Sequence, residues 1–203
     1  MALSDLLWAC PDCGEVGAIG PEGSCTCGVV FSRGRGGHID ARYPDGAVVE
    51  RTAAEWMDRL PAPEELLERA AAEGEPFRRA HVLAQEVVGS ANVRGGGRFL
   101  NRIERYGPAV KGSLSLTRDS AIYETLDAGG TARTWAFEDI TAVQGSSNTL
   151  QIKGRGQPLV SFRFLDDSIF LWELLLHAAL RDFYRRTGRG EIVEFQPRVT
   201  TDR

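Results

Sequence analysis

Residues 168–186 read SIFLWELLLHAALRDFYRR, and this stretch decides the fold that we expect for the chain. Apolar side chains recur in it at the three-to-four-residue spacing of one helix face. They are Ile169, Trp172, Leu176, Leu180 and Phe183, with Leu171, Leu175, Ala178 and Ala179 beside them. Glu173 and His177 interrupt the run, which is shorter than the roughly 18 apolar residues that a membrane-spanning helix needs. We therefore expect a helix that begins at Ser168 and lies on a protein core.

Short strand-like runs precede this helix, with turn residues and no helical segment between them. The seven runs are HVLAQEVVGSANV (81–93), GSLSLT (112–117), AIYETL (121–126), TARTWAF (131–137), DITAVQG (139–145), TLQIKG (149–154) and LVSFRFL (159–165). Because parallel strands need crossover connections, runs joined by turns predict an antiparallel meander. We expect an α+β fold, in which residues 79–188 form a strongly bent antiparallel sheet of about seven strands closed by the C-terminal helix.

The composition is that of an ordinary globular protein, with 42% hydrophobic and 26% charged residues among 203. The start, MALSDLLWAC, lacks the basic and apolar regions of a signal peptide, so we expect a cytoplasmic protein. The charge is uneven: residues 1–77 carry 6 Lys and Arg against 14 Asp and Glu, and residues 78–189 carry 16 against 11. Three readings stay open: the two parts dock on each other, the basic part meets an anionic partner, or both are simply solvated.

Four cysteines near the start of the chain form the pattern C-x2-C-x11-C-x-C: Cys10, Cys13, Cys25 and Cys27. Paired cysteines in a reducing compartment indicate metal ligands rather than disulfides. Glycine follows each pair, which suits the tight turns that surround a tetrahedral metal. The stretch from Trp8 to Ser32 resembles a zinc ribbon, although a single residue separates its second pair. The resemblance implies a structural Zn²⁺ with four cysteine ligands and no open position for a reactive water.

We expect residues 1–36 to form this zinc ribbon, with the metal as its core. A basic, glycine-rich linker, Ser32–Gly37, should lead into an acidic hairpin and helical connector over residues 37–78. At the other end of the chain, residues 189–203 form a tail with a strand-like run, IVEFQ, that either adds an edge strand or pairs with a partner.

Within the connector, HIDARY and AVVER flank the turn Pro44-Asp45-Gly46 and predict a β-hairpin. Thr52 and Glu55 have the spacing of a capping box and should open a short helix. A second helix should begin near Pro63 and end before Gly74. The connector is either a spacer or a cover for the following domain through its apolar residues. These are Trp56, Leu66 and Leu67.

The run KGSLSLTRDSAIY (111–123) is similar to the opening of GRAM domains, in which a glycine, alternating leucines and a threonine precede an apolar strand. GRAM domains share the pleckstrin-homology (PH) fold, and a tryptophan in the closing helix, here Trp172, also fits that fold. The resemblance covers about Arg79 to Thr187. It implies a PH-like domain in which Trp172 packs beneath the sheet.

The segment Arg94–Lys111, RGGGRFLNRIERYGPAVK, joins the first two runs and is our candidate binding loop. Its basic residues are Arg94, Arg98, Arg102, Arg105 and Lys111. Basic residues interleaved with apolar ones suit an anionic bilayer. The resemblance implies the same loop, because phosphoinositide-binding PH domains hold headgroups between their first two strands, although GSLSLT lacks the basic pair of the second strand. Alternatively, residues 99–103 form a short amphipathic helix that covers the open end of the sheet.

No catalytic motif stands out: GxSxG, HExxH, GxxxxGK[ST] and a strand-linked GxGxxG are all missing from the sequence. Asp166 and Asp167 suit the entry turn of the last helix better than an acid/base pair. We expect a non-enzymatic adaptor, cytoplasmic or peripheral at the membrane, that binds an anionic membrane surface or a protein partner through its PH/GRAM-like domain. One alternative is a regulatory or assembly subunit that acts only through protein contacts. A nucleic-acid-binding zinc-ribbon protein is less favoured, because the cysteine-bearing part is acidic.

Overall fold

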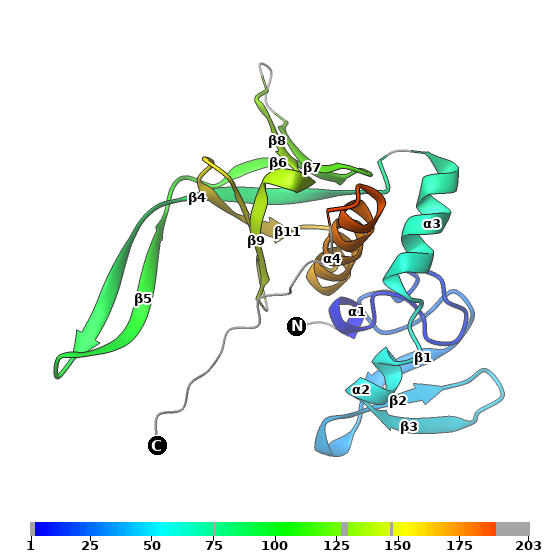
Figure 1. The fold of residues 1–203 in the computed structure, drawn as a ribbon. Helices are drawn as coiled ribbons and strands as arrows, with labels where there is room; N and C mark the ends of the chain where they lie inside the picture. The colour runs from blue at the N-terminus through cyan, green and yellow to red at the C-terminus, as the bar shows by residue number, and fades with distance from the viewer. Residues whose placement is uncertain (1–2, 75, 127–129, 147, 190–203) are drawn as a thin grey trace.

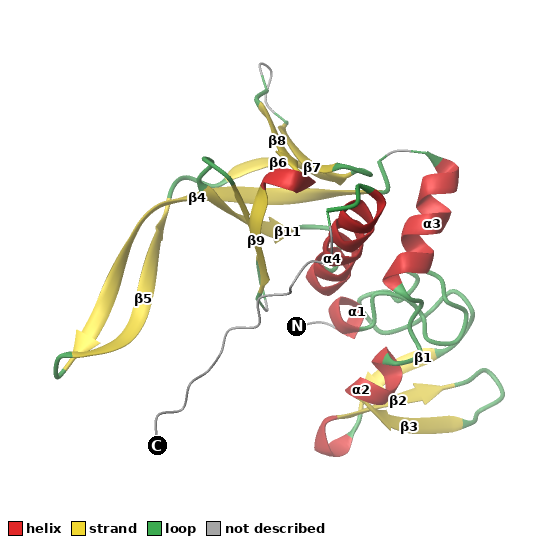
Figure 2. Ribbon diagram, viewed as in Figure 1, coloured by secondary structure: helices red, strands yellow, loops and turns green. Residues whose placement is uncertain are grey.

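The computed structural model describes residues 3–74, 76–126, 130–146 and 148–189, and describes only the backbone at positions 101 and 102. Within these ranges the chain contains a three-stranded sheet, an eight-stranded sheet and four α-helices (Figures 1 and 2). The elements in chain order are α1 (Leu3–Leu6), β1 (Val30–Arg33), η1 (Arg35–Gly37), β2 (His38–Arg42), β3 (Val48–Thr52), α2 (Ala53–Met57), α3 (Pro63–Glu73), β4 (Arg78–Gly95), β5 (Arg98–Tyr106), β6 (Val110–Leu116), β7 (Ser120–Thr125), β8 (Ala132–Ala136), η2 (Phe137–Asp139), β9 (Ile140–Gly145), β10 (Leu150–Gly154), β11 (Leu159–Phe164) and α4 (Ile169–Arg186).

The large sheet is antiparallel and is centred on β4. Its strand order is β8-β7-β6-β4-β11-β10-β9, and β5 pairs with β4 beside this path. With 18 residues, β4 is long enough for three partners. One edge pairs with β6 along residues 78–84 and then with β5 along residues 87–95, while the opposite edge pairs with β11 along residues 82–86. The two halves of the sheet therefore meet in β4 (Figure 1).

The helix expected at the C-terminus is confirmed as α4. Ser168 caps it, because its side chain accepts a hydrogen bond from the Leu171 N–H at 3.4 Å. Trp172 is only 1% exposed, and its ring lies 5.2 Å from that of Phe164 on β11. Burying such an apolar stripe stabilises the fold mainly by removing apolar surface from water. The buried residues of the stripe are Ile169, Leu171, Trp172, Leu175, Leu176, Ala178, Ala179, Leu180 and Phe183.

Asp167 ties the start of α4 to the start of β4. Its two carboxylate oxygens each accept a hydrogen bond from Arg78 at 2.7 Å. The same carboxylate accepts hydrogen bonds from the Trp172 indole N–H and the Ser168 backbone N–H, both at 2.8 Å. Such bidentate arginine pairs combine charge with fixed geometry. The entry turn of α4 is therefore held to the sheet at its Arg78 end.

All seven predicted runs coincide with strands, namely β4 and β6 to β11. The prediction of a loop over Arg94–Lys111 was wrong, as was the alternative of a short helix over residues 99–103. Residues 98–106 form β5, an eighth strand. The reason is local: Gly96 and Gly97 both have positive φ, 57° and 79°, which permits a tight turn directly between β4 and β5.

The expected linker Ser32–Gly37 is instead part of a hairpin: Ser32 and Arg33 belong to β1, and residues 34–37 connect β1 to β2. β1 pairs with β2 and β2 pairs with β3, so the segments 1–36 and 37–78 share one sheet. They also share one core, in which Trp56 packs edge-on against Phe31 at 5.4 Å and donates its indole N–H to the Ile39 carbonyl at 2.8 Å. The capping box before Trp56 is confirmed. The expected boundary between residues 36 and 37 therefore lies inside a single sheet.

Of the two roles weighed for the connector, α3 takes that of a cover, whereas Trp56 on α2 belongs to the core of the three-stranded sheet and not to the cover. Leu67 belongs to the large core, and Leu66 packs against it. Arg181 on α4 donates to the Glu64 carboxylate at 3.0 Å. The N-terminal segment also reaches this core through Trp8 and Ala9. The large core therefore packs the cysteine-bearing segment together with α3 and α4, and the connector does not act as a spacer between them.

None of the helices described is long and apolar enough to cross a membrane. The predicted IVEFQ strand lies outside the described residues.

Candidate metal centre and basic arm

The first pair of cysteines lies on a tight turn that ends in a glycine. The Gly14 N–H donates to the Cys10 carbonyl at 2.8 Å, and Gly14 has a φ of 73°, which an L side chain would strain. The Cys10 N–H donates to the Glu15 carbonyl at 3.0 Å. These bonds turn the chain back on itself, so that Cys10 and Cys13 present their sulfurs to the same point.

The second pair lies on a turn that is one residue shorter. Here the Gly28 N–H donates to the Cys25 carbonyl at 2.9 Å, and Gly28 has a φ of 93°. A Cβ at this glycine would also come within 3.0 Å of Pro44. In the first turn the glycine lies four residues after the first cysteine, and in the second turn it lies three residues after it. The shorter turn thus accommodates the single residue between Cys25 and Cys27.

The two turns bring all four cysteine sulfurs together. Every pair of Sγ atoms lies within 4.8 Å, and the Cys10–Cys27 and Cys13–Cys25 separations are both 3.7 Å. Four sulfurs placed tetrahedrally about 2.3 Å from a metal would be about 3.8 Å apart. The donor set and its spacing therefore fit a tetrahedral metal ion. The first histidine after the cysteines in the sequence, His38, is not part of this group.

The four thiols do not have equal environments. Burial raises the pKa of Cys10 to about 12. Burial also acts to raise the pKa of Cys25, but hydrogen bonds with the Cys27 backbone and with the neighbouring thiols outweigh it and bring that pKa to about 7. Cys10 and Cys25 are buried, whereas Cys13 and Cys27 are exposed. A bound cation favours the thiolate form of all four.

The basic residues predicted as a binding loop lie along a protruding hairpin. We call this hairpin, residues 87–106 of β4 and β5, the arm (Figure 1). At its tip, Arg94 is paired with Phe99, and Gly95 with Arg98. Arg105 lies seven residues further along β5, about 24 Å from Arg98 at strand spacing. Lys111 lies beyond the arm, on β6.

The structure thus places Arg94 and Arg98 at the tip, in successive pairs of the ladder whose side chains point to opposite faces, and separates both from Arg105 and Lys111. The backbone of Arg102 lies opposite Asn92 in the middle of the arm. Among the described residues no carboxylate forms an ion pair with Arg94, Arg98 or Arg105. The tip is therefore a small site with two uncompensated positive charges.

Exposed apolar side chains are concentrated on the arm. Of the ten large hydrophobic residues that are exposed in the described chain, five belong to it. They are Val88, Phe99, Leu100, Ile103 and Tyr106. Phe99 is 62% exposed and Leu100 is 64% exposed, both beside the turn of the tip. Contiguous apolar side chains on a surface commonly mark an interaction site.

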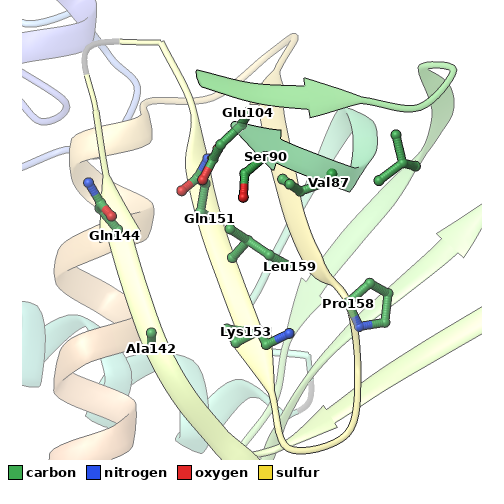
Figure 3. A pocket seen from close by; sticks show the side chains of 11 residues that line it. Val87, Ser90, Glu104, Ala142, Gln144, Gln151, Lys153, Pro158 and Leu159 are labelled. Carbon is green, nitrogen blue, oxygen red and sulfur yellow. The ribbon is translucent and has the colours of Figure 1, made fainter. Parts of the chain in front are cut away.

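The sequence did not indicate a cavity of about 450 Å³ at the base of the arm (Figure 3). A hydrogen-bond network lies on its wall: the Tyr106 hydroxyl donates to Glu104 at 2.8 Å, and the Gln151 amide donates to both, each at 3.1 Å. Glu104 and Tyr106 belong to β5 and Gln151 belongs to β10, and the distance between these strands depends on how the whole sheet is paired. No local sequence pattern could have predicted that the three side chains meet.

Comparisons with known proteins leave the family open. No family model matches the chain, and no curated protein does. Among solved structures, the chain is similar to the crystal structure of the C-terminal domain of an unknown protein from Leishmania infantum, at 13% sequence identity and a TM-score of 0.35. The similarity covers 58% of this chain and 97% of that one. A TM-score this low identifies neither fold family nor function, and the resemblance to GRAM and PH domains has no support from a family match.

Proposed function

We propose that this protein is a non-enzymatic adaptor whose PH/GRAM-like domain binds an anionic membrane surface through the tip of the arm. The strand order supports a PH-like arrangement: four strands on one side of the sheet, three on the other, both meeting at the first strand, and a closing helix. In such an arrangement the arm occupies the connection between the first two strands of the domain.

The observation that carries the proposal is the composition of the tip. Phe99 and Leu100 project into solvent beside Arg94 and Arg98. Burial of one such apolar side chain is worth about 1.5 to 3 kcal/mol when complete. Each arginine near an anionic surface adds about 1 kcal/mol. A tip with exposed apolar side chains and two neighbouring arginines thus suits shallow, reversible insertion at the level of the lipid headgroups.

The basic residues of β5 also favour this proposal. In the PH-like arrangement β5 lies within the connection between the first two strands, so GSLSLT remains the second strand, and its lack of basic residues argues against a headgroup site there. β5, RFLNRIERY, carries Arg98, Arg102 and Arg105. The arm therefore supports contact with an anionic surface rather than recognition of one headgroup.

Sedimentation with vesicles tests the membrane proposal. The full chain should sediment with phosphatidylcholine vesicles that contain phosphatidylserine at low salt, and less with phosphatidylcholine alone or at high salt. The double variants Phe99→Ser/Leu100→Ser and Arg94→Glu/Arg98→Glu should each lose binding. Leu165→Ser, which changes an exposed leucine outside the arm, is the matched control. Equal binding by all these proteins, or none by the parent at low salt, would reject the proposal.

We further propose that the cysteine centre holds one structural Zn²⁺. Four cysteines leave no ligand position for substrate, so the ion would hold the two turns together rather than react. Metal analysis after exhaustive dialysis should find about one zinc per chain, and Cys13→Ser, which removes an exposed ligand, should lower that content. A zinc content near zero in the parent protein would contradict this assignment.

A further inference from the structure

The cavity at the base of the arm lies in a fork between two strands. β4 and β11 pair up to Glu86 and Val160. Beyond that pair β4 continues into the arm. On the β11 side, Leu159 and Pro158 no longer pair with β4. The cavity fills the space between the diverging strands, with β9 and β10 as its far wall (Figure 3).

The edge of β4 that faces this fork is open. From Val87 outward, β4 pairs with β5 on the edge that it also shares with β6, and within the described residues no strand pairs with the opposite edge. Such an edge offers a row of backbone N–H and C=O groups to an added strand. A third strand would also support the arm, since an isolated two-stranded ribbon is marginally stable in water.

The walls of the fork define which segment fits. Val88, Pro158 and Leu159 give it apolar surface, and the side-chain amide of Gln144 gives it hydrogen-bonding groups. Small apolar side chains that alternate with polar ones would meet both kinds of surface in an extended strand.

The charges around the fork favour an acidic occupant. Lys153 lines the cavity, with its ammonium donating to the Gln157 carbonyl at 2.6 Å and two donors left. Arg105 of the adjoining arm pairs in the ladder with Gly89 of the cavity wall and has no ion-pair partner among the described residues. Glu104, the one acidic residue that lines the cavity, keeps its charge while it accepts hydrogen bonds from Tyr106 and Gln151, so Lys153 and Arg105 together leave an excess of one positive charge.

We propose that the fork is a docking site for an extended acidic peptide segment of a partner protein, which adds to the open edge of β4 in line with β11. The fork is separate from the tip, so this proposal does not depend on whether the tip binds membranes. A second copy of this chain is disfavoured as the occupant, because its own arm would bring like charges together.

Nuclear magnetic resonance of the full chain, with a model peptide as the probe, tests this proposal. We expect a ten-residue capped peptide of alternating Glu and Val to shift and protect the amides of Val87–Ser90 and Leu159. The same peptide with every backbone nitrogen methylated has no donors for strand addition and should not bind. A peptide with Lys in place of Glu should bind more weakly. Shifts outside the fork, no shifts at all, or equal binding by the N-methylated peptide would each overturn the proposal.

Charge reversal at the fork supplies the matched comparison. Lys153→Glu should weaken binding of the acidic peptide about five-fold, as expected for one partly exposed ion pair replaced by a repulsion. Lys111→Glu makes the same charge change on β6 outside the cavity and should leave the affinity unchanged. Thermal denaturation shows whether each variant is folded, and Lys153→Gln replaces Lys153→Glu if the latter is not. Equal losses at both lysines, or loss in Phe99→Ser/Leu100→Ser, would place binding elsewhere and reject the fork.

Discussion

The cysteine turns and the arm are both small elements without a conventional core of their own, and they are stabilised in opposite ways. Around Cys10, Cys13, Cys25 and Cys27 the chain converges on a single point and packs against buried residues on either side. Within the described part of the chain, the outer part of the arm pairs only with itself and exposes its apolar side chains. The comparison indicates that the first element supports the fold, whereas the second is free to meet a partner.

Removal of the metal should have the largest effect and would test the first half of this comparison most directly. In small zinc-binding peptides, metal binding supplies on the order of 10 kcal/mol of folding free energy. We expect a strong chelator to unfold the cysteine turns and, because Trp8 and Ala9 enter the large core, to lower the melting temperature of the sheet as well. Circular dichroism and hydrogen exchange can follow both. Unchanged exchange in residues 8–31 after verified metal loss would show that the ion is not structural.

Trp172→Ala should be the most damaging change in the large core. It removes a fully buried ring and leaves Asp167 without one of its donors, so the free energy of unfolding should fall by about 3 to 5 kcal/mol. Urea denaturation measures this loss. Leu174→Ala, at an exposed position of the same helix, is the control and should cost less than about 1 kcal/mol. A cost for Trp172→Ala no larger than for Leu174→Ala would contradict the packing described.

Shortening the arm should change stability far less. Asn-Gly in place of residues 91–103 would join Ser90 to Glu104, which face each other in the ladder, through a favoured two-residue turn. We expect the free energy of unfolding to change by less than about 1 kcal/mol, because the described strand pairing of the deleted part lies within the arm itself. Vesicle binding should be lost while the zinc content stays the same. A large loss of stability would mean that the arm supports the fold after all.

The smallest effect concerns the ion pair between α3 and α4. A hydrogen bond from its own backbone N–H at the start of α3, followed by Arg181, lowers the pKa of Glu64. A carboxyl with a lowered folded-state pKa contributes stability above its unfolded pKa and loses it as the pH falls through the folded value. Glu64→Gln should therefore cost below about 1 kcal/mol at neutral pH, since the pair is about half exposed. The difference from the parent protein should vanish in acid, and a difference that persists there would rule out this pair as its cause.

The sequence predicted the elements whose signals are local. The stripe from Ile169 to Phe183, the alternating runs and the cysteine spacing each depend on neighbours along the chain, and each appears in the structure. The expected loop failed for an identifiable reason: Gly96-Gly97 is a hairpin signal, but the residues after it alternate weakly between basic and apolar. The fork could not be predicted, because it depends on where β4 and β11 cease to pair.

A single strand, β4, runs from Arg78 to Gly95 at the end of the arm, and Asp167 at the entry of α4 holds Arg78. The nine residues beyond Glu86 span about 30 Å at strand spacing. For protein engineering, the turn at Gly96 and Gly97 is therefore a natural attachment point. A dye or a short inserted epitope placed there would report on the surroundings of the arm while remaining remote from the packed body and from the cysteine centre.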